Sequence, residues 1–172
     1  MNLLRDLGAG KNAPDEINVV VEVPKGSRNK YEYDKENGVF ILDRVLRSPF
    51  HYAGDYGFVP QTLCGDGDPL DVVILVDQPS FPGCVINARP VAMLLMKDEK
   101  GTDEKILAVP ADDSRYDEMK NMETVPAHIL KEIAHFFEQY KVLEKGKWAK
   151  VEGWKNADEA KRLIKASMKA FK

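Results

Sequence analysis

The stretch INVVVEVPKGSRNKYEYDKENGVFIL, residues 17–42, decides the fold. Residues 17–23 are rich in β-branched side chains and lie between two prolines, a pattern that predicts a β-strand. Residues 30–33 and 39–42 flank the pair Asn37-Gly38, which supplies the left-handed conformations of a tight turn, so they predict a hairpin. The chain is therefore expected to begin as β-structure.

The pattern beyond this stretch continues as β-structure and then changes to helices. Further strands are predicted at residues 57–60, 72–76, 85–96 and 105–109. In residues 126–142, apolar side chains recur at helical spacing, which predicts an amphipathic helix. Asn156 followed by Glu159 is an N-terminal capping signature, and a second helix is predicted to follow it. We expect an α+β domain, mainly β: a small closed or partly open barrel with two main helices packed outside.

Length and composition favour one ordinary domain. The 172 residues, 44% of them hydrophobic, are enough to bury a core, so residues 1–172 are expected to form a single domain. No apolar stretch is long enough to span a membrane, and residues 1–11 lack the apolar core of a signal peptide. Cys64 and Cys84 show no CxxC spacing and cannot form a disulfide framework. A cytoplasmic protein with two reduced, non-catalytic thiols is expected.

The charge balance argues against nucleic acid as a partner. The chain has 25 Lys and Arg against 28 Asp and Glu, a net charge of −3 that gives no basic footprint for a phosphate backbone. The charges are uneven, because residues 55–77 contain five Asp and no Lys or Arg, whereas residues 141–172 are rich in Lys. Such a contrast fits either a cation site facing an anion site or ordinary solvated surface.

Asp66-Gly-Asp-Pro-Leu-Asp71 is the strongest local signal for chemistry. It places three carboxylates within six residues, and Gly67 and Pro69 predict a turn that can point their oxygens inward. Hard oxygen ligands at this density suit magnesium, manganese or calcium. By itself the motif fits a solvated turn that caps backbone amides equally well. An EF-hand loop is excluded, because Leu70 and Asp71 stand where that loop needs an oxygen ligand and a glycine.

Besides a further acidic pair, Asp98 and Asp103 in a predicted turn between two strands, the sequence contains residues with the chemistry to bind anions. The candidate cations and phenols are Lys30, Arg44, Lys105, Lys141, Tyr52, Tyr56 and Tyr140. Arg offers a planar fork for phosphate oxygens, Lys a point charge and Tyr a neutral donor, although each residue taken singly is better explained as solvated or packed. Serine-nucleophile, P-loop and dinucleotide motifs are absent, which leaves metal-assisted chemistry as the enzymatic interpretation.

The order of these motifs along the chain resembles that of the soluble family I inorganic pyrophosphatases. Residues 66–71 are similar to the family signature Asp-x-Asp-Pro-x-Asp. The other similar blocks, in the family's own order, are Lys30-Tyr-Glu-Tyr-Asp-Lys35, Asp43-Arg44, Tyr56-Gly-Phe-Val-Pro60, Arg89-Pro-Val91, residues 103–110, His135-Phe-Phe-Glu-Gln-Tyr-Lys141 and Gly146-Lys-Trp-Ala-Lys-Val-Glu-Gly-Trp154. The resemblance covers residues 10–160.

The resemblance implies a five-stranded barrel of the oligonucleotide-binding (OB) topology that hydrolyses inorganic pyrophosphate to two phosphates with several Mg²⁺ ions. The metal-binding residues it implies are Asp66, Asp71, Asp103, Asp98, Glu22 and Glu32. The substrate-binding residues it implies are Lys30, Arg44, Tyr56, Lys105, Tyr140 and Lys141. Asp68 is implied as the general base, Tyr56 as a second catalytic residue and Tyr52 as part of the same pocket. Resemblance to the short bacterial members also implies a homohexamer.

Three departures from the family pattern stand out. Asp55 replaces the usual asparagine and is expected to add negative charge beside the site. His51 and the pair Ala53-Gly54 replace a stretch that usually contains proline. Gln139 replaces a frequent histidine, which removes a residue on which an oligomer interface can depend. None of these positions is a proposed ligand.

Two other functions are compatible with the sequence. OB-like barrels also serve as nucleic-acid-binding modules, which need a basic face with exposed stacking aromatics. The acidic cluster and the net charge of −3 argue against such a module. A phosphatase for larger phosphate esters would use the same metal chemistry as a pyrophosphatase, so only a comparison of substrates separates the two.

Overall fold

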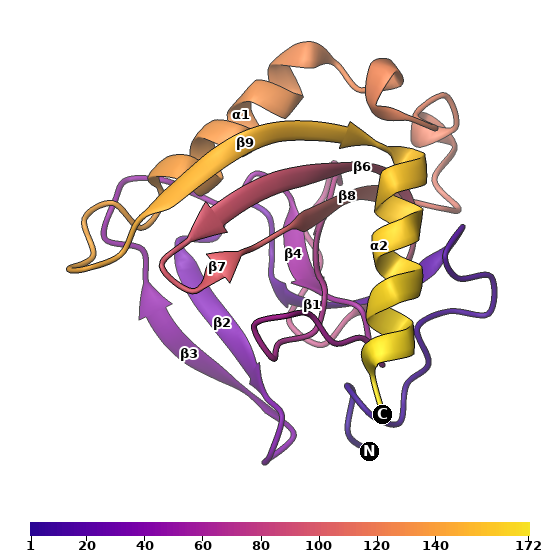
Figure 1. The fold of residues 1–172 in the computed structure, drawn as a ribbon, viewed down its shortest axis with the longest axis horizontal. Helices are drawn as coiled ribbons and strands as arrows, with labels where there is room; N and C mark the ends of the chain where they lie inside the picture. Colours follow the sequence, from indigo (N-terminus) through magenta and orange to yellow (C-terminus); the bar gives the residue numbers. More distant parts are fainter.

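The predicted barrel is present as a closed ring of five strands (Figure 1). In the computed structural model, which describes residues 1–172, β1 (Ile17–Val23) pairs antiparallel with β4 (Asp55–Phe58), and β4 pairs antiparallel with β5 (Asp71–Ile74). Strand β5 runs parallel to β8 (Lys105–Pro110), β8 antiparallel to β6 (Val85–Asp98), and β6 returns to β1. The expected OB-like, five-stranded barrel is confirmed. The ring is uneven, because β6 has 14 residues and β4 only 4.

Strand β6 is long enough to carry two further strands outside the ring. The short β7 (Gly101–Thr102) folds back on its end, and β9 (Ala149–Asn156) pairs along its second half. The sequence did not predict β9, because none of its residues is fully buried and it has no strongly apolar face. Its position depends on pairing with β6, which only the folded sheet reveals.

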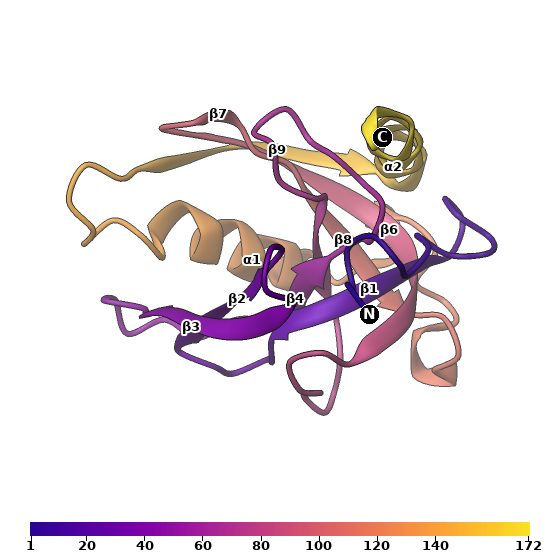
Figure 2. The same cartoon turned by 90° about the horizontal axis from the view of Figure 1, so that it is seen from below.

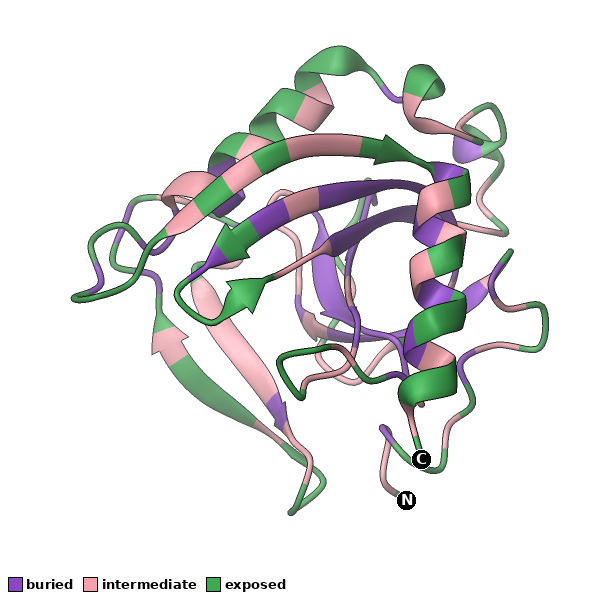
Figure 3. Cartoon of the chain, viewed as in Figure 1, coloured by how far each residue is buried: buried purple, intermediate pink, exposed green.

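The predicted hairpin forms a separate two-stranded sheet from β2 (Asn29–Asp34) and β3 (Val39–Val45). The turn agrees with the expectation only at Gly38, which is left-handed with φ +69°; Asn37 is not left-handed, and four residues, 35–38, connect the two strands. The backbone N–H of Gly38 donates to the carbonyl oxygen of Asp34 at 2.8 Å. Strand β2 contacts β1, whereas most of β3 is exposed (Figure 3). The hairpin therefore projects from the barrel and forms one wall of the cavity described below.

Both predicted helices are present and pack outside the ring (Figures 1 and 2). Helix α1 (Ala127–Gln139) packs against β9, and α2 (Ala157–Ala170) packs against β6 and β9. Asn156 caps α2, and its side chain accepts the backbone N–H of Glu159 at 3.1 Å, as the capping signature predicts. Two short 3-10 turns, η1 (Ser114–Tyr116) and η2 (Met122–Thr124), connect β8 to α1. Neither main helix has the length and apolar character to cross a membrane.

The ring strands bury side chains on both faces, so the protein has two large apolar clusters. On β5, Val73 belongs to the cluster that includes Phe137 of α1. Val72 and Ile74, on the other face, belong to the cluster that includes Ile164 of α2. Full burial of a Phe or Ile side chain stabilises the fold by about 1.5–3 kcal/mol relative to an exposed one. Each helix thus contributes to a different one of the two apolar clusters.

Strand β4 approaches β1 so closely that Gly57 has no room for a side chain. A Cβ atom at this position would lie 1.9 Å from the carbonyl oxygen of Val20. The flanking residue Tyr56 pairs with Val23 in the ladder between the two strands. The close approach therefore fixes Tyr56, whose side chain lines the cavity.

Candidate active site

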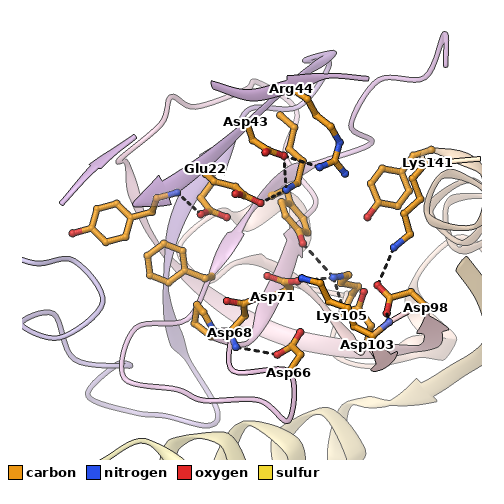
Figure 4. A pocket seen from close by; sticks show the side chains of 18 of the residues that line it. Glu22, Asp43, Arg44, Asp66, Asp68, Asp71, Asp98, Asp103, Lys105 and Lys141 are labelled. Atoms are coloured by element: carbon orange, nitrogen blue, oxygen red, sulfur yellow. Dashed lines mark hydrogen bonds and ion pairs between the residues drawn. The ribbon is translucent and has the colours of Figure 1, made fainter. Parts of the chain in front are cut away.

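A cavity of about 410 Å³ is lined by residues of the barrel, the hairpin and the end of α1 (Figure 4). All thirteen residues that the sequence proposes for metal binding, substrate binding and catalysis line it. They are Glu22, Lys30, Glu32, Arg44, Tyr56, Asp66, Asp68, Asp71, Asp98, Asp103, Lys105, Tyr140 and Lys141. The fold therefore brings these residues together from separate elements, and the role of each stays a prediction.

The cavity lining is strongly charged, with nine carboxylates and seven Lys or Arg side chains, a formal charge of −2. Five of these charged residues were not proposed from the sequence, namely Lys35, Asp43, Glu99, Lys100 and Lys147. Two had a signal, because Asp43 precedes Arg44 and Lys35 ends the similar block at residues 30–35. Lys147 also had a signal, because it lies in the similar block at residues 146–154, whereas Glu99 and Lys100 lie in a turn without a distinguishing pattern. Excess negative charge opposes the entry of a polyanion unless further cations are bound.

Lys105 occupies the centre of the most buried charge cluster. It lies opposite Asp71 in the parallel ladder of β5 and β8, and its ammonium is 2.5 Å from Asp71 Oδ2. The same ammonium is 2.7 Å from Asp103 Oδ1 and donates to the Tyr56 hydroxyl at 3.3 Å. Burial lowers the pKa of Lys105, but the two carboxylates outweigh burial and hold that pKa well above its usual value.

Asp103 shares this ammonium with Asp71, so the cluster has one more negative charge than positive charge. Burial raises the pKa of Asp103, and although Lys105 opposes this effect, the neighbouring Asp71 adds to it. Burial is the largest cause of the raised pKa, and repulsion from Asp71 contributes because the two carboxylates share one ammonium. An additional cation would stabilise the ionised form of both carboxylates.

The loop before β5 carries Asp66 and Asp68. Gly67 has φ +86°, as expected for a turn, and the backbone N–H of Asp68 donates to Asp66 Oδ1 at 3.0 Å. Asp66 thus caps a backbone amide, as the interpretation of the motif as a solvated turn predicts. The side chains of Asp66 and Asp68 nevertheless both line the cavity. The Asp68 carboxylate forms an ion pair with Lys35 from the hairpin turn and is 49% exposed, so it is accessible to water.

Glu22, on β1, faces the cavity beside the hairpin. Its Oε1 accepts the backbone N–H of Tyr33 at 2.8 Å. Burial raises the pKa of Glu22 to about 8, an effect that the Tyr33 N–H opposes and that Asp71 strengthens. At neutral pH this side chain is largely a neutral acid unless a cation binds beside it.

Lys30 and Arg44 are paired residues on the two strands of the hairpin, and they share one carboxylate. Asp43 Oδ2 is 3.2 Å from Lys30 Nζ and 2.7 Å from Arg44 Nη1. Lys30 also forms an ion pair with Glu32. These contacts hold two cations side by side on the hairpin wall, where both line the cavity. Such an arrangement suits the oxygens of a phosphate group.

Lys141 follows α1 directly and lies on the opposite wall. It is only 4% exposed, and its ammonium is 2.8 Å from Asp98 Oδ2 and 3.2 Å from Glu99 Oε2. The interpretation of Lys141 as a solvated lysine is therefore wrong. Burial raises the pKa of Asp98, but the hydrogen bonds from Lys141 and from the Lys100 N–H, together with the charge of Lys141, outweigh burial and bring that pKa below its usual value. Tyr140, the C-cap residue of α1, lines the cavity beside it.

Two expectations about neighbouring residues are wrong. Tyr52 is 3% exposed and packs behind Tyr56, at a ring-centroid distance of 5.3 Å, instead of lining the cavity. Asp55 is fully buried, and its carboxylate accepts the backbone N–H groups of Lys25 and Ser80, so it adds no charge to the cavity. Adjacent residues in a strand point to opposite faces, which is why Asp55 and Tyr56 cannot both face the cavity.

The donor chemistry of the cavity fits magnesium. All of its potential metal ligands are carboxylates, and no His or Cys lines it, so the donors are hard oxygens. No three Asp, Glu, His or Cys side chains converge into a closed metal cage, because Asp71 and Asp103 close on the Lys105 ammonium instead. The fit therefore depends on the type of donor and on the unbalanced negative charge around Lys105.

The barrel and its cavity define a class of enzyme. Carboxylates that suit divalent cations face a set of Lys, Arg and Tyr side chains that suit phosphate oxygens. This combination is typical of enzymes that catalyse metal-assisted hydrolysis of phosphate compounds.

Comparison with known proteins narrows the class to one family. The chain matches the family model described as inorganic pyrophosphatase over residues 19–172. It is 53% identical to an inorganic pyrophosphatase of Agrobacterium fabrum over 169 residues, 96% of each chain. It is 49% identical to one of Xylella fastidiosa over 169 residues, 96% of this chain and 95% of the relative.

The fold agrees with these sequence matches. The crystal structure of the inorganic pyrophosphatase from Thermus thermophilus aligns with a TM-score of 0.97 and 47% identity, covering 99% of both chains. The chain therefore belongs to the inorganic pyrophosphatase family, a family of hydrolases. This confirms the resemblance inferred from the sequence, and the match extends beyond residue 160 to the last residue of the chain.

Proposed function

We propose that this chain hydrolyses inorganic pyrophosphate to two phosphates in the cavity of Figure 4, with several Mg²⁺ ions as cofactors. The observation that carries the proposal is the lining of nine carboxylates and seven Lys or Arg side chains around about 410 Å³. Membership of the family supports the reaction and its dependence on metal. The choice of magnesium is supported by the all-oxygen donor set.

The carboxylate wall is the proposed metal site. Asp66, Asp71 and Asp103 are proposed as the residues that would hold the activating ions. Asp98 and Glu22 are proposed to hold further ions, and Glu32 to support this wall. When bound there, magnesium supplies positive charge that offsets the substrate, together with Lewis acidity that lowers the pKa of water.

The remaining residues are proposed to hold the substrate and move the proton. Asp68 accepts a proton from the attacking water while the water oxygen bonds to one phosphorus of pyrophosphate. The bond between that phosphorus and the bridging oxygen breaks, and the other phosphate leaves. Lys30, Arg44 and Lys105 bind the phosphate oxygens, and Lys141 neutralises charge on the leaving phosphate. Tyr56 and Tyr140 are also proposed to line the substrate site, because a hydroxyl donates a hydrogen bond without adding charge.

Phosphate release from magnesium pyrophosphate tests this function, with ATP and p-nitrophenyl phosphate as comparison substrates. Pyrophosphate should be hydrolysed far faster than either comparison substrate. Asp68→Asn should lower kcat by about 10²–10⁴-fold, the usual contribution of a general base. The matched control is Asp112→Asn, an exposed carboxylate outside the cavity, which should behave as the wild type. Equal rates on p-nitrophenyl phosphate would support the broader phosphatase instead, and salt-dependent binding to single-stranded DNA would favour a nucleic-acid module.

We further propose that residues 1–172 act as one domain of a cytoplasmic homohexamer, without a nucleic-acid or membrane partner. The support is the resemblance to the short bacterial members of the family. Light scattering tests the assembly, because a hexamer has six times the 19.4 kDa mass of one chain. A monomer at assay concentration would contradict the proposal, and cell fractionation tests the location.

A further inference from the structure

Glu144 is a buried carboxylate that has no part in the proposed reaction. It lies in the segment between α1 and β9, is 8% exposed and does not line the cavity. Its Oε1 is 2.7 Å from Nε of Arg44, at the end of β3. Neither of these two atoms makes a hydrogen bond to any other group. The ionic contact between them is therefore the only polar interaction that either atom has.

This contact constrains Arg44, which does line the cavity. Asp43 binds Nη1 of the same guanidinium at 2.7 Å, so two carboxylates hold it through two of its nitrogens. Nη2 has no protein partner and is available to an anion in the cavity. A guanidinium whose orientation is already fixed loses less side-chain entropy when it binds an oxyanion.

Glu144 also belongs to the segment that carries Lys141. Its backbone N–H donates to the carbonyl oxygen of Lys141 at 3.0 Å, and its own carbonyl oxygen accepts the N–H of Lys147 at 3.2 Å. A second contact between the same two regions is made by the buried Ser48, whose hydroxyl donates to the carbonyl oxygen of Tyr140 at 3.3 Å. The segment after α1 is thus tied at two points to β3 and the segment that follows it, through Arg44 and through Ser48.

We propose that Glu144 is a positioning residue that fixes the Arg44 guanidinium in the orientation that binds a phosphate group. Through this contact it couples the hairpin wall to the wall that carries Lys141. The inference rests on the proposed function, because it requires Arg44 to bind substrate. Glu144 does not line the cavity itself, but it contacts two cations that do: Arg44 at 2.7 Å and, more weakly, Lys147, whose Nζ is 3.6 Å from Glu144 Oε2. We assign its main effect on the reaction to the shorter contact, with Arg44.

A double-mutant cycle tests the coupling. The variants are Glu144→Gln, which keeps the size of the side chain and removes its charge, Arg44→Ala, and the two combined. Steady-state kinetics with magnesium pyrophosphate and calorimetric binding of inorganic phosphate are measured on each. Glu144→Gln should lower kcat/KM about tenfold, mainly through KM, and weaken phosphate binding by a similar factor. Arg44→Ala should lower kcat/KM about 100-fold.

In the Arg44→Ala background, adding Glu144→Gln should cost less than about twofold, because the arginine through which it acts is gone. The matched control is Glu138→Gln. Glu138 accepts the N–H of Val151 at 3.3 Å and so ties α1 to β9 without touching a cation of the cavity. This control should leave the kinetics and phosphate binding unchanged.

Two results would overturn the inference. Unchanged KM and phosphate binding in a folded Glu144→Gln variant would show that Arg44 needs no support from Glu144. A full tenfold loss in the Arg44→Ala background would show that Glu144 acts on the loop alone. If Glu144→Gln does not fold, Glu144→Asp replaces it in the cycle, because it keeps the charge and shortens the reach. The two proposals can fail separately. If Glu144→Gln weakens phosphate binding only when Arg44 is present, but the wild type does not hydrolyse pyrophosphate, this inference is supported and the proposed function is rejected.

Discussion

Glu22→Gln is expected to change how the stability of the metal-free protein depends on pH. Burial raises the pKa of Glu22 to about 8 in the folded protein, against 4.5 for an unperturbed Glu side chain. Between these two values the folded protein holds a proton that the unfolded chain has lost. The contribution of Glu22 to the free energy of unfolding of the wild type should therefore be fully present below pH 4.5 and be lost as the pH rises from 4.5 through 8. Glutamine has no proton to lose and removes this dependence.

The magnitude follows from the two pKa values, which differ by about 3.5 pH units. At about 1.4 kcal/mol per unit, the upper limit is about 5 kcal/mol. Because Glu22 is only half-buried and faces water in the cavity, we expect about half of this, 2–3 kcal/mol. The side-chain oxygen of glutamine can still accept the Tyr33 N–H, so the substitution isolates the charge.

Urea denaturation in the presence of a chelator, repeated from pH 4.5 to pH 9, measures the effect. The gap in unfolding free energy between Glu22→Gln and wild type should widen in favour of the variant by about 2–3 kcal/mol over this range. Glu36→Gln, an exposed position in the hairpin turn, should run parallel to the wild type. Parallel curves for Glu22→Gln as well would refute the reasoning. If Glu22 helps to hold a metal, added magnesium at pH 8 should stabilise the wild type more than the variant.

Three further predictions concern the chemistry. Phosphate release should require magnesium, and full activity in excess chelator would reject the metal site. Calcium should substitute poorly, because its bonds to oxygen of about 2.3–2.6 Å and its irregular coordination geometry misplace the reacting groups. Asp71→Asn should lower kcat by at least about 100-fold. The control Asp77→Asn should keep kcat within about twofold of the wild type, because Asp77 lies outside the cavity and accepts a hydrogen bond from the Tyr116 hydroxyl at 3.1 Å. Equal losses of kcat in both folded variants would show that the ligand assignment is wrong. Lys141→Ala should raise KM and lower kcat while magnesium titration of the free enzyme stays nearly unchanged, whereas normal kinetics with a lower melting temperature would remove Lys141 from the substrate site.

Most of the secondary structure could be predicted from the sequence because its determinants are local. The β-branched run of β1, the Asn37-Gly38 turn and the Asn156 cap each lie within a few residues of the structure they specify. Strand β9 could not be predicted in this way, because it lacks a strongly apolar face and is defined by its partner β6. The family, and with it the hydrolase activity, could also be recognised from motifs along the chain.

What only the tertiary structure decided is how the charged groups pair. Lys105 balances Asp71 because parallel strands place them opposite each other. Glu144 reaches Arg44 across a long separation in sequence. Asp55, next to Tyr56 in sequence, faces away from the cavity. Electrostatic energy depends on distance through space and on burial, and the order of residues along the chain specifies neither until the strands have closed into a barrel.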